Sequence, residues 1–331
     1  AHMKEEVKGY ALRMKESDGD TETISGSDID IEYVADDSVE KLIKKQNPLL
    51  WITGLWKQQN IESSVGVKYD KDKLAKVIEN LDCMAEENQI PSVSAKPEFT
   101  GEKFEVAAEQ IGTAIDKDKF AETVTKAING FQSEVDLMKE DCYILPKYTK
   151  DSPEVAKACE KMNSELGANI TLDFSPNTEV VDSSVISQWI TVDDNMQVTF
   201  NQDAVKQYIA DLAAKYDTVG KTRNFTTATG NVVQVEGGGY GWKIDQDAEY
   251  NALITNIQNA ETVTREPNYS SRAATHDAND WGTTYAEVDL TAQHMYFIQN
   301  GQIAMQCDIV TGNPNKGNAT PQGMYSLYYK Q

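Results

Sequence analysis

The fold is set by a stretch that occurs twice, as Ile111-Gly112-Thr113-Ala114-Ile115-Asp116-Lys117-Asp118 and, 129 positions later, as Tyr240-Gly241-Trp242-Lys243-Ile244-Asp245-Gln246-Asp247. The glycine, the isoleucine and both aspartates are identical in the two stretches. The apolar positions that follow also match without a gap, Val124 with Leu253 and Ile128 with Ile257. Self-similarity at a fixed distance indicates two copies of one structural module.

The repeat extends upstream. Residues 69–74 match residues 200–205 at a distance of 131 positions, and a surface loop absorbs the two-residue difference easily. The sequence therefore predicts a first module over residues 25–150 and a second module over residues 151–270.

Each module is predicted to contain two amphipathic helices. In the first module, an acidic start at Asp70 and Asp72 suits a helix N-terminus. Five apolar residues then recur at the spacing of a single helix face: Leu74, Val77, Ile78, Leu81 and Met84.

Asp116 and Asp245 follow short β-like runs at the start of the other predicted helices. We interpret them as helix N-caps, whose carboxylates accept a hydrogen bond from a free backbone N–H. Paired acids can also bind a metal ion or act as an acid–base couple, but the N-cap interpretation is preferred.

Residues rich in β-formers lie between the helices, at 29–33, 169–174, 197–200 and 231–236. These runs do not alternate with helices in regular βαβ units. The sequence therefore predicts an α+β fold, with two tandem modules whose sheets are mainly antiparallel.

The formal charge is −22 and no run of five basic residues occurs. Nucleic acid is excluded as a partner, because phosphate backbones are bound by clustered lysine and arginine.

Ala1-His2-Met3 is interpreted as an expression scar, which with a polar leader occupies residues 1–24. We expect a signal peptide or membrane anchor to have preceded this charged stretch. The sequence itself has no apolar window of about 18 residues.

The four cysteines are too sparse for a disulfide scaffold. Cys142 and Cys159 are close enough in sequence for a bridge, and free buried thiols are an equal alternative. No metal site is predicted, because His276 and His294 have no zinc-like spacing. Cys307 lies in a predicted strand and is interpreted as structural packing. No cofactor is predicted.

The glycine-rich stretch 237–241 lacks the lysine and serine or threonine of a phosphate loop, and a turn or bulge is preferred. Among the aromatic residues, Trp51, Trp56 and Trp189 are predicted to be core. Trp242, with Tyr240, is the candidate for contact with a ligand, since flat aromatic faces stack on sugars.

The C-terminal region changes character. Residues 285–297 alternate as a strand, Asn300-Gly301 predicts a hairpin turn, and residues 302–310 return. Thr311-Gly312 and then Ala319-Thr320-Pro321-Gln322-Gly323-Met324-Tyr325 follow. This run resembles the start of the L,D-transpeptidase catalytic domain of the YkuD type. Residues 271–331 are therefore expected to be a linker and the opening β-hairpin of a β-rich catalytic domain.

The resemblance implies a chemistry whose residues are absent from this sequence. The family uses a cysteine in a Ser-His-Gly-Cys stretch, with a further histidine, to form a thioester with a stem peptide and pass it to an amine. No such stretch occurs, so no catalytic residue is assigned. We expect the chain to be a truncated and inactive part of a cross-linking enzyme. Its hairpin at residues 285–310 is expected to pack on the second module or to self-associate.

The two modules resemble the peptidoglycan-binding modules that precede such catalytic domains in Gram-positive bacteria. The matching stretches are residues 45–51, 216–218, 223–225, 238–242 and 265–267. The resemblance implies an extracytoplasmic protein with peptidoglycan, its stem peptides or glycan strands, as partner, and a membrane only through the removed anchor. A non-catalytic wall-binding protein and a spacer remain alternatives.

Overall fold

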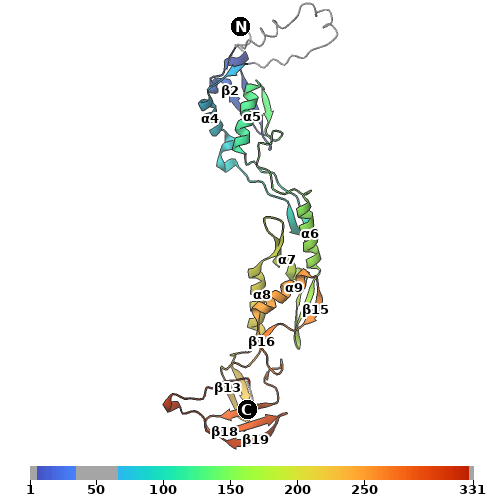
Figure 1. Cartoon of the computed structure of the whole chain (residues 1–331), viewed down its shortest axis with the longest axis vertical. Helices are drawn as coiled ribbons and strands as arrows, with labels where there is room; N and C mark the ends of the chain where they lie inside the picture. The colour runs from blue at the N-terminus through green and yellow to red at the C-terminus, as the bar shows by residue number, and fades with distance from the viewer. Residues whose placement is uncertain (1–5, 35–65, 328–331) are drawn as a thin grey trace, which may run out of the picture. The chain divides into compact units, whose positions relative to one another are not determined.

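The computed structural model describes residues 6–34 and 66–327. The chain divides into two compact units: unit 1 comprises residues 1–96 and 107–152, and unit 2 comprises residues 97–106 and 153–331. Figure 1 shows the elements of both units. Trp51, Trp56 and the stretch 45–51 lie outside the described residues.

Unit 1 is built on a three-stranded sheet with order β2-β1-β7, in which β2 is antiparallel and β7 parallel to β1. The described residues of this unit also form the helices α4 and α5 and a short antiparallel pair, β3 and β4. The bounds are β1 Ala11–Lys15, β2 Thr21–Ser25, η1 Gly26–Ile29, β3 Glu32–Tyr33, β4 Val67–Lys68, α4 Lys71–Glu79, η3 Asp82–Met84, η4 Glu86–Asn88, α5 Lys117–Asn129 and β7 Glu134–Asp136.

The first predicted helix is shorter than its apolar stripe. α4 ends at Glu79 because Leu81 has an extended backbone, with ψ of 143°. Leu81 and Met84 are still buried in the same core as Leu74, although they lie beyond the helix. Similarly, the strand predicted at 29–33 is limited to Glu32–Tyr33.

Unit 2 repeats this plan, with sheet order β15-β8-β9. Again the middle strand has one antiparallel and one parallel neighbour. The bounds are α6 Pro153–Leu166, β8 Asn169–Phe174, β9 Asn177–Val181, α7 Ser183–Trp189, β10 Ile190–Val192, β11 Val198–Phe200, α8 Gln202–Tyr216, β12 Arg223–Thr226, β13 Val232–Val235, β14 Lys243–Ile244, α9 Gln246–Gln258, β15 Thr262–Arg265 and β16 Tyr269–Ser271.

The predicted helix caps are confirmed. The Asp116 carboxylate accepts hydrogen bonds from two backbone N–H groups at the start of α5, and Asp245 accepts one at the start of α9. Trp189 is buried, as predicted. The sheets and helices of the two units also confirm the α+β class, with two repeated modules and small, mainly antiparallel sheets.

One hairpin of unit 2 comes from within the first module's sequence. It consists of β5 Lys96–Phe99 and β6 Phe104–Ala107. Phe104 is 5% exposed and lies in the core of unit 2. Its backbone N–H donates to Asn163 Oδ1 at 2.7 Å, and Asn163 Nδ2 donates back to its carbonyl at 2.8 Å. This exchange fixes the hairpin on α6.

The C-terminal sheet of unit 2 has three antiparallel strands: β17 Tyr285–Asp289, β18 His294–Gln299 and β19 Gln302–Asp308. The single strand predicted over residues 285–297 is wrong, because the chain turns between β17 and β18, where Gln293 adopts a φ of 53°. The turn at Asn300-Gly301 is confirmed. Cys307 lies in a strand, as predicted, but every residue of β19 is exposed, so the interpretation of its thiol as structural packing is wrong.

The three other cysteines, Cys83, Cys142 and Cys159, are free and buried. In the part of the chain that the structure describes, no helix has the length and apolar character needed to cross a membrane.

Candidate functional site

A pocket of about 330 Å³ in unit 2 lies around the predicted ligand residue Trp242. Its wall includes Thr218, Lys221, Arg223 and His276. The side chain of Arg223 is buried and paired with Asp280: Nε donates to Oδ1 at 2.9 Å and Nη2 donates to Oδ2 at 2.7 Å. The Thr218 hydroxyl donates to the same carboxylate at 2.6 Å. A buried charge is tolerated here because it is paired and hydrogen bonded.

Of the two predicted ligand residues, Trp242 lines the pocket, whereas Tyr240 does not line it and contacts Asp280, which does. The indole of Trp242 is 6% exposed, stacks on His276 with ring centroids 3.9 Å apart, and donates from Nε1 to the Thr275 carbonyl at 2.8 Å. The Tyr240 hydroxyl donates to the Asp280 carbonyl and accepts from the Ala274 N–H. Both side chains are thus occupied by protein, and their contact with a ligand stays a prediction.

Burial changes the acidity of groups near the pocket. It raises the pKa of the Tyr240 hydroxyl and of the Asp217 carboxyl, which accepts from the Ile244 N–H at 2.8 Å. No serine or cysteine lines the pocket. The pocket offers charged and hydrogen-bonding groups to a ligand.

The glycine-rich stretch 237–241 has a role that sequence reasoning missed. Met324 N–H donates to the Gly237 carbonyl at 3.2 Å, and Tyr240 N–H donates to the Met324 carbonyl at 3.1 Å. A Cβ on Gly238 would lie 2.0 Å from the Met324 carbonyl oxygen. The glycines thus allow close approach of the loop that ends in Gln322-Gly323-Met324.

The C-terminal sheet also contacts the second module. Tyr285 and Trp281 pack against Phe225 of β12, with ring centroids 5.6 and 5.5 Å apart. The Ala228 N–H donates to the Glu287 carboxylate at 2.8 Å. Packing of the tail on the second module, one of the two expected outcomes, is therefore observed. Self-association stays a prediction.

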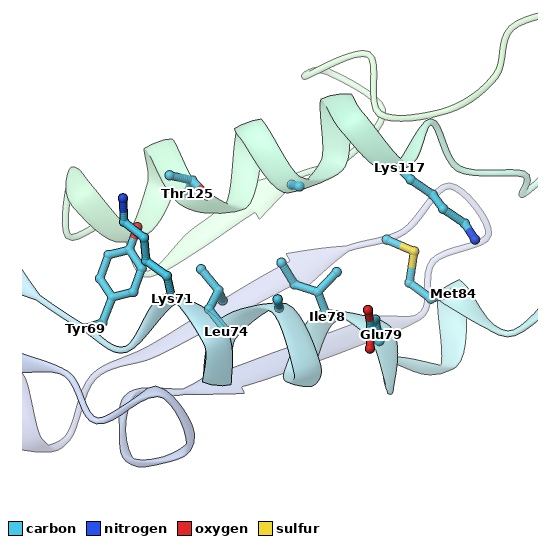
Figure 2. Close-up of a pocket in the computed structure, with 10 residues that line it drawn as sticks. Tyr69, Lys71, Leu74, Ile78, Glu79, Met84, Lys117 and Thr125 are labelled. Atoms are coloured by element: carbon cyan, nitrogen blue, oxygen red, sulfur yellow. The ribbon is translucent and has the colours of Figure 1, made fainter.

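A second candidate site is a half-open groove of about 480 Å³ in unit 1, between α4 and α5 (Figure 2). Leu74 and Ile78 project into it from α4 and Thr125 from α5. Lys71 and Lys117 lie at its opposite ends. In the repeat, α8 and α9 pack in direct contact. The sequence signal that was missed is the pair of small residues Ala75 and Ala121, which line the groove.

Unit 1 also brings together three groups that could hold a metal ion. One ligand atom each from Glu16, Glu22 and Cys83 lies within 4.8 Å of the others. The Glu22 carboxylate already accepts from the N–H groups of Asp82 and Cys83 at 3.0 and 2.7 Å. Burial raises the pKa of the Cys83 thiol, which disfavours the thiolate that metals require. We assign no metal to this cluster.

Comparison with known proteins agrees with the repeat. Residues 22–136 and 148–265 each match the family described as "Putative peptidoglycan binding domain", and residues 283–331 match the L,D-transpeptidase catalytic domain. No curated protein matches.

Two solved structures are similar. The L,D-transpeptidase of Enterococcus faecium shares 33% identity with a TM-score of 0.38, over 50% of this chain and 64% of that one. The Ldtfm–avibactam carbamoyl enzyme shares 32% identity with a TM-score of 0.39, over 51% and 65%. The chain thus spans less than two thirds of the length of either relative.

Proposed function

Because this chain belongs to the family built on the peptidoglycan-binding domain, with two copies of that domain and an L,D-transpeptidase region, we propose that it acts outside the cytoplasm at the bacterial cell wall. Its modules bind peptidoglycan and carry a catalytic domain that cross-links peptidoglycan peptides. The observation that carries the proposal is the structural repeat followed directly by the docked C-terminal sheet.

The docking contacts support a mechanical role for the second module. Its glycine loop receives Met324, and its hairpin β12–β13 contacts the sheet through Phe225 and Ala228. The transpeptidase region is thereby attached to a wall-binding module by backbone hydrogen bonds and aromatic packing. Such an attachment restricts where the catalytic domain can meet its substrates, which raises its effective concentration near the wall.

The chemistry proposed for the catalytic domain is acyl transfer through a cysteine thioester, as the family resemblance implies. Cys307 is not assigned as the nucleophile. It lies on the exposed strand β19 opposite Met295, and no described histidine is hydrogen bonded to it. A cysteine nucleophile needs a base within hydrogen-bonding reach.

Sedimentation with purified sacculi tests the wall-binding part. The whole 331-residue chain is mixed with sacculi, the mixture is centrifuged, and the supernatant is assayed for the protein. We expect depletion that persists at about 0.15 M salt, whereas an acidic protein of similar size and charge stays in solution. No depletion at any salt concentration would contradict the proposal.

The charge of −22 favours a second candidate, in which the modules are spacers that keep the catalytic domain away from the membrane. Anionic wall polymers would repel such a surface. The spacer function predicts no sedimentation with sacculi, including sacculi from which anionic polymers have been removed.

A further inference from the structure

The residues that line the groove between α4 and α5 differ from those at the corresponding positions of the second module. In the repeat, Ala75 corresponds to Lys206 and Ala121 to Tyr250, at the two distances that relate the modules. Lys206 Nζ lies 5.7 Å from the centroid of the Tyr250 ring. These two larger side chains therefore come together where the first module has two alanines.

The charged residues of the groove also differ between the modules. Lys71 corresponds to Gln202 and Lys117 to Gln246. Both lysines are exposed and line the groove, and neither forms an ion pair with any residue that the structure describes. In a chain of net charge −22, two unpaired lysines at opposite ends of one apolar groove favour a ligand with carboxylates.

The lining of the groove specifies the ligand further. Leu74, Ala75, Ile78 and Ala121 form an aliphatic floor, and the carboxylate of Glu79 lies at the same end as Lys117 (Figure 2). A sugar would need flat aromatic faces, of which the lining has one, Tyr69. A short peptide with methyl side chains, carboxylates and an amine matches the floor, the two lysines and Glu79.

We propose that this groove binds the peptide stem of peptidoglycan, and that the second module does not bind it at the corresponding place. The proposal rests on the proposed function and deepens it, because it divides the work between the modules. The first module recognises the peptide, and the second module supports the C-terminal sheet.

The test is an NMR titration of the whole chain with a sugar-free stem peptide that carries a diamino acid and a terminal carboxylate. We expect the methyl signals of Ala75, Ile78 and Ala121 to shift and those of α8 and α9 to stay. Ala121→Tyr, which introduces the residue of the second module, should abolish the shifts because it fills the groove.

A second variant keeps the test valid if Ala121→Tyr does not fold. The double variant Lys71→Gln, Lys117→Gln changes two exposed side chains to those of the second module and should weaken peptide binding about tenfold or more. Lys119→Gln removes one positive charge from α5 outside the groove and should have little effect. Equal binding by the double variant and this control would overturn the proposal.

If something other than the stem peptide occupies the groove, the same measurements give a different result, and each of the following results overturns the proposal. Contacts between the groove methyls and Trp51 or Trp56 would mean that the chain itself fills the groove. Shifts caused only by peptide-free glycan would assign it to sugar, and loss of dimers in Ala121→Tyr would assign it to a second copy. If the chain sediments with sacculi but the stem peptide shifts no groove signal, this inference fails while the proposed function stands. If the stem peptide shifts the groove signals but the chain does not sediment with sacculi, the groove binds the peptide and the proposed binding to the intact wall fails.

Discussion

Arg223 and Asp280, 57 positions apart, form a buried two-point ion pair in which side-chain exposure is 7% for the arginine and 4% for the aspartate. Arg223 lies on β12, and Asp280 precedes the C-terminal sheet. The pair therefore fastens the segment that leads into β17 to the second module. Arg223 also donates to the carbonyls of Lys221 and Tyr240, so all its polar atoms are used.

Removal of either charge of the Arg223–Asp280 pair should destabilise unit 2. Asp280→Asn leaves the guanidinium buried without its counter-charge, and we expect a loss of about 3–5 kcal/mol in the local opening free energy of unit 2. Hydrogen exchange at the amides of β12 and β17 measures this loss. Lys103→Gln, which breaks an exposed pair with Glu105, should have a much smaller effect, because water screens exposed ion pairs. Equal effects of the two variants would show that the buried pair has no special role.

Gly238→Ala tests the contact between the glycine loop and Met324. The φ of Gly238 is +86°, and its new Cβ would lie 2.0 Å from the Met324 carbonyl oxygen. We expect the loop to separate, so that the amides of Tyr240 and Met324 lose protection from hydrogen exchange.

Gly239→Ala is the matched control, because its Cβ meets nothing within 4 Å. It should leave both amides protected. Full protection in Gly238→Ala would mean that the Met324 contact does not need this glycine.

The sequence predicted those parts of the fold that depend on local signals. The helix caps Asp116 and Asp245 were found because a cap bonds to N–H groups two or three residues away. The strands at 169–174 and 231–236 and the turn at Asn300-Gly301 were found for the same reason: β-formers and turn residues act on their own neighbourhood.

The parts that were missed depend on contacts distant in sequence. Nothing local marks Phe104 as a core residue of unit 2 or pairs Gly238 with Met324. The strand at residues 285–297 was predicted too long because the turn at Gln293 contains neither glycine nor proline. The groove was missed because an apolar helix face has the same pattern whether it is covered or open.

Thiol labelling tests the burial of the cysteines. Cys307 on β19 is exposed, whereas Cys83, Cys142 and Cys159 are at most 8% exposed. Burial also raises the pKa of all three buried thiols, and the thiolate is the reactive form. In the native protein we expect one fast-reacting thiol toward an aromatic disulfide reagent at pH 8, and four after unfolding.

Cys307→Ser should remove the fast phase and leave the slow one unchanged. A fast phase that persists in this variant would show that one of the interior thiols opens to solvent readily.

Glu16 makes the stability of unit 1 depend on pH. Burial, with the nearby charges of Glu22, Asp18, Asp20 and Asp82, raises the pKa of Glu16 to about 7 from an ordinary value near 4.5. Between these two values the folded chain binds more protons than the unfolded chain, so a rise in pH favours unfolding. The stabilisation is complete below about pH 4.5 and is lost as the pH rises through about 7.

We expect Glu16→Gln to remove this dependence and to make unit 1 more stable than the wild type at pH 8. Hydrogen exchange at β1 amides, corrected for the intrinsic pH dependence of exchange, measures it between pH 5 and 8. Glu122→Gln, which changes an exposed carboxylate on α5, should keep the wild-type slope. A wild-type slope in Glu16→Gln as well would assign the effect to another group, and the pH titration of the Glu16 carboxyl carbon signal would then show a midpoint well below 7.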